Sequence, residues 1–244
     1  MICKEVYKDK GKFSILGVSC NETELLSIVP EIKNACFDVD GQIQFQNYID
    51  NLSDTGFNAP HQAYSVKSWQ VGEGIAQVYL EKCCNVTFPW SSNRDLKNPA
   101  SSLSGADLVG FHQEKFAFGE VKTSQEEATP PQVTSKADGL SKQLERLCLD
   151  VNLRWTLIQY LFHRCKDQSS YKKACEYYVQ DNQDFNIFGI LIRDTKPDIA
   201  DWNYLNKHLN SHNTSRVSLT AIYLIITNGI NALPNLVSGG KYDH

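Results

Sequence analysis

The sequence predicts an α/β protein with a mixed central sheet flanked by helices. The first observation is a helical pattern over residues 68–84, where Val71 and Ile75 recur on one face. The second is a pair of short apolar runs, 185–192 and 217–226, with almost no polar alternation. Runs of this kind are typical of strands that are covered on both faces, so a sheet between two helical layers is expected.

Helices and strands alternate along most of the chain, and clusters of Gly, Pro, Ser and Asn mark the loops between them. The stretch from Asp138 to Cys165 has an apolar period of about 3.6 residues, which predicts one long helix. The expected elements, in chain order, are a helix over 68–84, strands over 85–90, 105–112 and 115–122, a helix over 138–165, a strand over 185–192, a helix over 198–213 and a strand over 217–226.

Three regions are expected along the chain. Residues 1–67 carry a strand near 13–18 and a helix that begins near Asn21, and they end in a polar loop before Pro60. We interpret them as an N-terminal α+β appendage whose role the sequence leaves open, because the Asn, Asp, Gly and Pro cluster marks a boundary. Residues 68–233 form the core domain, and residues 234–244 form a C-terminal tail.

Composition restricts the class of protein. The 244 residues are 41% hydrophobic and 21% charged, as in an ordinary globular chain, and the net charge of −4 gives no overall positive field. No apolar run approaches the roughly 20 residues that span a bilayer. The first residues lack a secretory signal, so a cytoplasmic protein without membrane association is expected. The eight cysteines lack zinc-ligand spacing and are expected to be free thiols.

The informative residues lie in two neighbouring predicted strands. Asp107 opens the first strand, and the second strand carries Glu120, Val121 and Lys122. Because strand side chains alternate, Glu120 and Lys122 share one face. A two-residue turn at 113–114 would place Asp107 opposite Glu120, whereas a one-residue bulge would shift this pairing. In either register two carboxylates come together, which favours a bound divalent cation; oxygen ligands favour a hard ion such as Mg²⁺.

This pattern resembles the PD-(D/E)XK superfamily, a group of metal-dependent phosphodiesterases that includes restriction and repair nucleases. The resemblance implies that the mixed sheet and its helices form a restriction-endonuclease-like core. The resemblance covers residues 72–122, where a helix bearing Glu73 precedes Asp107 and the Glu-x-Lys triplet. It implies that Asp107, Glu120 and the Val121 carbonyl hold Mg²⁺, that Mn²⁺ can substitute, and that Glu73 is an outer or second-metal ligand. Lys122 would then orient or deprotonate the attacking water and counter the charge of the transition state.

Two departures from the family pattern concern neighbouring positions. Gln143 lies where some members place a helical glutamine, but these members have a tyrosine four residues later and this chain has Leu147. Ala106 stands where many members have proline. The Gln143 assignment is therefore weaker than the assignments of Asp107 and Glu120.

Each candidate also has a simpler interpretation. Asp107 could be a solvated residue at a strand edge, and Glu120 with Lys122 could be an exposed ion pair worth under about 1 kcal/mol. Glu73 could only complement the dipole of its helix. The triplet Glu31-Ile32-Lys33 shows how little specificity Glu-x-Lys has alone, since a helix does not place residues two apart on one face.

Nucleic acid is the expected partner, with DNA favoured over RNA. Residues 136–173 contain eight Lys or Arg and four Asp or Glu, so this segment carries +4. Lys136, Lys142 and Arg146, with Gln143, are candidate contacts to a phosphate backbone, although a solvated amphipathic helix explains them equally well. A looser resemblance, to small bacterial antiphage effector nucleases of the Hachiman type, implies a defence role with a helicase or ATPase partner.

Two other functions remain open from the sequence. The same fold could serve as a catalytically silent nucleic-acid-binding or scaffolding subunit with an acidic pocket. The same carboxylates could also hydrolyse phosphodiester bonds in RNA or in a small nucleotide. Metal binding discriminates the silent subunit from the enzymes, because a scaffold gains nothing from gathering Asp107 and Glu120 around Mg²⁺.

Overall fold

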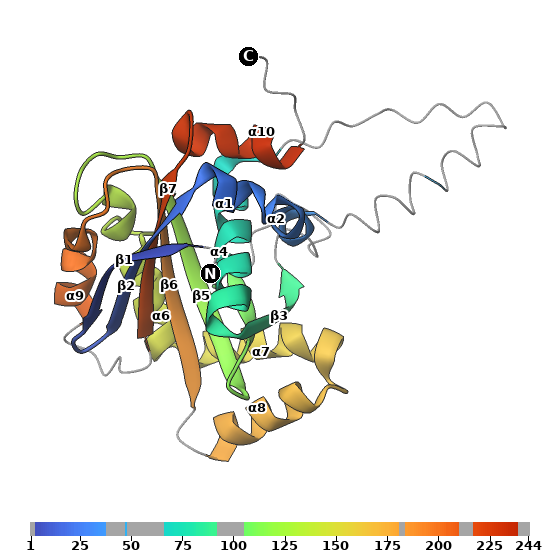
Figure 1. Cartoon of the computed structure of the whole chain (residues 1–244). Helices are drawn as coiled ribbons and strands as arrows, with labels where there is room; N and C mark the ends of the chain where they lie inside the picture. Colours follow the sequence, from blue (N-terminus) through green and yellow to red (C-terminus); the bar gives the residue numbers. More distant parts are fainter. Residues whose placement is uncertain are drawn as a thin grey trace.

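A seven-stranded mixed sheet forms the centre of the protein, and helices cover both of its faces (Figure 1). The structure, a computed structural model, describes residues 3–37, 47, 66–91, 105–180, 184–209 and 217–238. The predicted class, a mixed α/β sheet flanked by helices, is confirmed. The strands are β1 (Lys4–Lys10), β2 (Ser14–Asn21), β3 (Val86–Ser91), β4 (Leu108–His112), β5 (Lys115–Ser124), β6 (Phe185–Arg193) and β7 (Val217–Ile225).

The strand order across the sheet is β1-β2-β7-β6-β5-β4-β3. The four central strands β2, β7, β6 and β5 run parallel, and the pairs at both ends of the sheet are antiparallel. Parallel neighbours need crossover connections, which helices supply. The described helices are α1 (Glu22–Leu26), α2 (Val29–Cys36), α4 (Ser68–Cys84), α6 (Leu140–Leu149), α7 (Val151–Cys165), α8 (Ser169–Gln180), α9 (Asn203–Leu209) and α10 (Leu233–Ser238), with 3₁₀ helices η1 (Gln132–Thr134), η2 (Ile199–Trp202) and η3 (Gly229–Ala232).

Successive side chains of β5 point to opposite faces of the sheet and pack into two separate hydrophobic layers. Ala117 and Val121 pack into the layer that contains α2, α4 and α10. Phe116 and Phe118 pack into the layer on the other face, formed by α6, α7, α8 and α9. Because the alternation has a period of two, Glu120 and Lys122 point toward the second layer, as the sequence predicted for a shared face.

Helix α4 begins and ends where the sequence predicted, at Ser68 and Cys84. Its N-cap is Lys67, and the Gln70 side chain accepts a hydrogen bond of 2.9 Å from the Lys67 backbone N–H. Asn85 ends the helix in the left-handed conformation, with φ of 54°. Asparagine is one of the few residues that tolerate this conformation, so the helix stops there and β3 follows at once.

The N-terminal residues belong to the same sheet, which differs from the expected appendage. β2 pairs in parallel with the C-terminal strand β7, from Ser14 opposite Ser218 to Asn21 opposite Ile225. Cys20 and Ile32 share their hydrophobic layer with Val71 of α4. The polar loop at 51–56 lies outside the described residues. Within the described residues, the chain before position 67 is therefore not a separate domain, because β2 is a strand of the central sheet and shares its hydrophobic layers.

Two further expectations differ in detail. The predicted helix over 138–165 is two helices, since Asp150 is extended and its side chain caps α7 by accepting 3.0 Å from the Leu153 N–H. The predicted tail at 234–244 begins inside α10, which packs against α2 and α4 (Figure 1). Residues 239–244 and the expected helix end at 210–213 lie outside the described residues. None of the described helices is long and apolar enough to cross a membrane.

Candidate active site

The hairpin of β4 and β5 fixes the position of the two predicted metal carboxylates. Its turn residues Gln113 and Glu114 both have positive φ, 51° and 62°, the conformation of a tight two-residue turn. The register runs without a shift to Leu108 opposite Gly119. The Asp107 N–H donates to the carbonyl of Gly119, the residue that already pairs with Leu108, so Asp107 and Leu108 share one partner as in a one-residue bulge. The alternative of a shifted pairing at Asp107 is therefore the one that the structure has.

β5 continues to Ser124, while its pairing with β4 stops at Gly119; we call this end of the hairpin, where the described part of β4 begins, the notch. Asp107 closes the start of this notch. Its backbone N–H donates 2.9 Å to the Gly119 carbonyl, and its Oδ2 accepts 2.8 Å from the Val121 N–H. The N–H and C=O of one strand residue point to the same edge, so the Val121 carbonyl also points toward the notch.

Glu120 is a buried carboxylate with an ammonium beside it. Its exposed fraction is 2%, and Lys122 Nζ lies 3.8 Å from its Oε2. Burial raises the pKa of Glu120 well above its ordinary value, and the nearby charge of Asp107 raises it further, while Lys122 acts in the opposite direction. Glu120 Oε2 makes no hydrogen bond with any described residue. The simpler interpretation from the sequence, an exposed ion pair of Glu120 with Lys122, is therefore wrong, because Glu120 is buried.

Glu73 reaches this region from α4, on the other side of the sheet. Glu73 is buried. Its charge raises the pKa of Glu120, but this effect is smaller than that of Asp107. Glycines on both sides of it allow α4 to approach its neighbours closely. A Cβ at Gly72 would lie 2.1 Å from Thr123 Oγ1 of β5, and a Cβ at Gly74 would lie 2.7 Å from Cys36 Sγ of α2.

Gln143 lies on the helix that covers the Glu120 face of the sheet. Its neighbour Leu144 packs on Gly189, which pairs with Glu120 in the β5–β6 ladder. Gln143 Oε1 is buried and makes no hydrogen bond with any described residue. The structure thus places Gln143 on a helix that packs against β5 and β6.

The predicted basic contacts are less closely associated with this site. Lys136 and Arg146 are exposed. Lys142 Nζ forms an ion pair of 2.9 Å with Glu145 on the same helix, and Glu145 also lies 3.0 Å from His208. These partners lower the pKa of Glu145 to about 2. Lys142 is therefore partly neutralised by a surface network toward α9.

Sequence reasoning missed a buried polar network behind the candidate site. Arg193 at the end of β6 is completely buried, and its guanidinium donates to Asp201 Oδ1 at 3.1 Å and to the carbonyls of Glu126 and Ala128. Asp201 also accepts 2.8 Å from the Tyr223 hydroxyl. This network holds the loop that directly follows β5. A charged residue ending an otherwise apolar run was the available signal.

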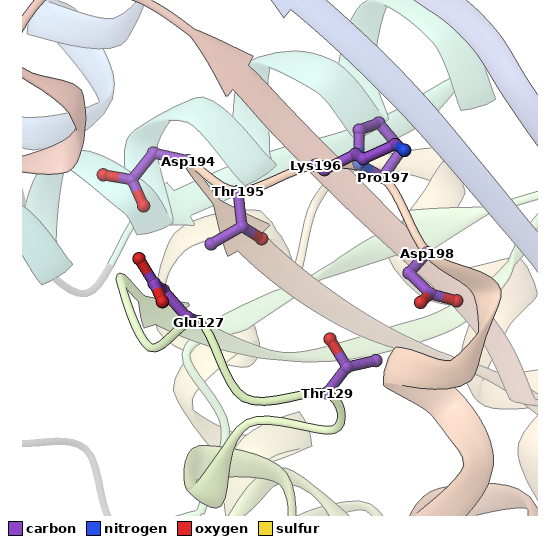
Figure 2. Close-up of a pocket in the computed structure, with 7 residues that line it drawn as sticks. All are labelled: Glu127, Thr129, Asp194, Thr195, Lys196, Pro197 and Asp198. Carbon is purple, nitrogen blue, oxygen red and sulfur yellow. The ribbon is translucent and has the colours of Figure 1, made fainter.

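A pocket of about 550 Å³ lies beyond the carboxyl ends of β5 and β6 (Figure 2). Glu127 and Asp194 lie at one end of it, and Thr129 and Asp198 lie at the other. None of the residues predicted from the sequence lines this pocket, so it is separate from the notch.

The chemistry of the notch is that of a pair of carboxylates with one ammonium. Among the described residues no three His, Cys, Asp or Glu side chains form a group that could hold a metal ion. Asp107 and Glu120 come together as predicted, and Glu73 contributes at longer range. The described parts of the chain therefore supply two carboxylates and one backbone carbonyl for a hard cation, with solvent as the source of further ligands.

No protein-family model matches the chain, and a search of curated proteins finds no significant match to its sequence. The function is therefore inferred from the residues and their geometry.

Proposed function

We propose that the chain is a Mg²⁺-dependent nuclease of the PD-(D/E)XK type that hydrolyses phosphodiester bonds. The observation that carries the proposal is the pair of Asp107 and Glu120, which lie close enough for the charge of Asp107 to raise the pKa of Glu120, with Lys122 Nζ 3.8 Å from the buried Glu120. Glu120 is 2% exposed and lies beside a second carboxylate, and burying it there lowers the stability of the fold. Such arrangements cluster where charge serves a reaction, so this pair is a candidate functional site.

The donor set fits Mg²⁺. Carboxylate and carbonyl oxygens are the ligands that this ion prefers, and it retains several waters instead of demanding a full protein cage. Glu120 Oε2, which has no hydrogen-bond partner among the described residues, is an available ligand atom. Asp107, Glu120 and the Val121 carbonyl would hold the ion, and Glu73 would act as an outer or second-metal ligand.

When bound, the ion would lower the pKa of a coordinated water and neutralise charge that develops on the phosphate. The chain positions the participants. The Val121 N–H fixes Asp107 through the 2.8 Å hydrogen bond, so this carboxylate is oriented before any ligand arrives. Lys122, whose side chain is 22% exposed, can hold a water or a phosphate oxygen at Nζ from the solvent side of Glu120.

DNA is the substrate that we favour, and a helicase or ATPase is the proposed partner, in an antiphage defence or DNA-processing role. The support is the looser resemblance to Hachiman-type effectors and the modest positive segment at 136–173. Lys142 is paired with Glu145, and the net charge of the segment is only +4. Weak intrinsic DNA affinity and delivery of the substrate by a partner follow from that.

The test is cleavage of plasmid and single-stranded DNA in Mg²⁺, Mn²⁺ or EDTA by wild type, Glu120→Gln and Lys122→Ala. The matched controls are Glu31→Gln and Lys33→Ala, which make the same changes in the second Glu-x-Lys triplet of the chain, in α2. Circular dichroism confirms that each variant is folded. We expect metal-dependent cleavage that both site variants abolish and both control variants retain.

Calorimetry with Mn²⁺ separates the remaining outcomes. Binding by wild type and loss of binding in Glu120→Gln, without cleavage of free DNA, would indicate an enzyme that needs its partner. Absence of both Mn²⁺ binding and cleavage in wild type would overturn the proposal in favour of a silent nucleic-acid-binding or scaffolding subunit. Cleavage of RNA or a small nucleotide, but not DNA, would change the substrate class.

A further inference from the structure

Two cysteines face each other across the antiparallel pair of β1 and β2. The register begins with Lys4 opposite Ser19, so the next pair outward is Cys3 and Cys20. Directly opposed residues of an antiparallel pair have side chains on the same face, and both thiols lie in the hydrophobic layer that contains α4. Cys3 is 5% exposed and Cys20 is 1% exposed.

The backbone geometry of this pair suits a disulfide. Opposed residues in an antiparallel ladder have Cα atoms about 4.5–5.5 Å apart, and disulfides span Cα separations of about 4.4–6.8 Å. Both cysteines are free thiols in the structure. The proximity of the two thiols raises the pKa of Cys3 and lowers that of Cys20, as expected for opposed side chains in this register.

Other buried cysteines are placed differently. Cys165 lies within α7 and donates to the Leu161 carbonyl at 2.7 Å, and Cys36 lies in α2 and donates to the Gln70 carbonyl at 3.5 Å. Cys20 donates to the Asn21 carbonyl at 3.8 Å, so the difference is the strand pairing and not the hydrogen bond. Cys83 and Cys84 are adjacent in α4, where a disulfide between neighbours is strained. Cys3 and Cys20 therefore stand apart as opposed thiols in a strand pair.

We propose that Cys3 and Cys20 are a modification site that forms an intrachain disulfide by exchange with a small-molecule disulfide such as glutathione disulfide. The Cys20 thiolate attacks one sulfur of the reagent, which forms a mixed disulfide and releases one glutathione thiolate. Cys3 then attacks the Cys20 sulfur, its proton passes to the departing sulfur, and a second glutathione is released. Two protein thiols are oxidised and one reagent disulfide is reduced, so the electrons balance.

The position of β1 explains how buried thiols can react. β1 is an edge strand with a single strand neighbour, and most of its side chains are exposed. Local opening of an edge strand costs less than global unfolding and admits a reagent. At its centre β1 is held by Tyr7, whose hydroxyl lies 2.9 Å from that of Tyr223 in β7. The disulfide would hold the other part of β1, beside Lys4, so the strand would be fixed at two points.

The experiment treats the full chain with glutathione disulfide, blocks remaining thiols with iodoacetamide and maps the peptides by mass spectrometry. We expect a Cys3–Cys20 linked peptide and a melting temperature higher by about 5 °C, because the bond closes a loop of about 18 residues. Dithiothreitol should reverse both changes. Cys20→Ser should show neither change, whereas Cys165→Ser, a variant in α7, should still show both.

The inference is overturned if iodoacetamide still alkylates Cys3 and Cys20 after the oxidation step, while the exposed Cys83 has formed a mixed disulfide with glutathione. It is also overturned if the linked peptide joins other cysteines. The peptide map of wild type decides this even if Cys20→Ser fails to fold. Nuclease activity is not needed for either result, so this inference and the proposed function stand or fall separately.

Discussion

The chain contains two similar triplets, Glu120-Val121-Lys122 in β5 and Glu31-Ile32-Lys33 in α2, and they have opposite environments. Glu120 is 2% exposed, and burial raises its pKa. The Glu31 side chain is 42% exposed, and a hydrogen bond from Lys82 Nζ at 2.7 Å lowers its pKa. In the strand, Lys122 shares a face with Glu120; in the helix, the partner of Glu31 comes from α4. A three-residue pattern therefore acquires chemical meaning only from its secondary structure and burial.

Helix α4 lies between these two regions and contacts both. Gly72 faces Thr123 of β5, and Gly74 faces Cys36 and Ile32 of α2. Glu73, between the glycines, is near enough to Glu120 to affect its pKa. The side of α4 toward β5 thus brings charge to a buried carboxylate, while its far end supplies Lys82 to the solvated Glu31. The comparison can be tested by changing one region and using the other as its control.

The largest expected effect is on catalysis. Glu120→Gln should lower the rate of Mg²⁺-dependent DNA cleavage by about 10³-fold or more, because a metal ligand contributes several kcal/mol to transition-state stabilisation. Glu31→Gln should change the rate less than about twofold, as expected for a surface residue. Initial rates under identical conditions provide the measurement. Equal effects of the two substitutions would contradict the distinction between the triplets.

The next effect concerns stability in the absence of metal. Glu120 has a raised pKa, so above the ordinary value of 4.5 the unfolded chain loses a proton that the folded chain retains. The free energy of unfolding should therefore fall as the pH rises above the ordinary value of 4.5. Glu120→Gln should remove this component and stabilise the metal-free protein at pH 8 by roughly 1–3 kcal/mol, the cost of a poorly compensated buried polar group.

Urea unfolding in EDTA at several pH values measures this component, and Glu31→Gln is the control. Glu31 has a lowered pKa, so its contribution is present above 4.5 and is lost as the pH falls. The two substitutions should thus change the pH dependence with opposite sign. A destabilised Glu120→Gln protein at pH 8 would show that the buried charge is well compensated without metal.

A smaller effect is expected from the packing of α4 on β5. Gly72→Ala would bring a Cβ to 2.1 Å from Thr123 Oγ1, so overpacking should outweigh the gain in helix propensity and cost about 1–2 kcal/mol. Adding Thr123→Ala should restore most of this loss, because the nearest remaining atom, the Thr123 Cβ, is 3.4 Å away. A double-mutant cycle by urea unfolding measures the coupling. Additive effects would contradict the contact.

The smallest effect is expected at the exposed pair. Lys82→Ala should cost less than about 1 kcal/mol, because solvent and salt screen the ion pair with Glu31. The difference from wild type should shrink further in about 1 M NaCl, where the screening length is about 3 Å. Thermal unfolding at low and high salt is the measurement. A loss of stability above about 2 kcal/mol in Lys82→Ala would contradict the description of Glu31 as a solvent-exposed carboxylate.

Much of the local structure followed from sequence patterns. The helix over 68–84, the strands near 115–122, 185–192 and 217–226, and the tight turn between β4 and β5 all depend on interactions between residues close in the chain. Helix α8 was not anticipated, and the break at Asp150 was missed, because the apolar period continues through it. A cap formed by one side chain outweighed periodicity there.

The sequence by itself determined which residues could form a two-carboxylate site, since alternation in one strand and one hairpin register place Asp107, Glu120 and Lys122 together. Only the tertiary structure decided that Glu120 is buried, that Glu73 approaches it from α4, and that β2 joins β7 instead of an appendage. The physical reason is that burial and strand pairing across some 200 residues are set by layers of side chains from the whole fold, which a local pattern does not contain.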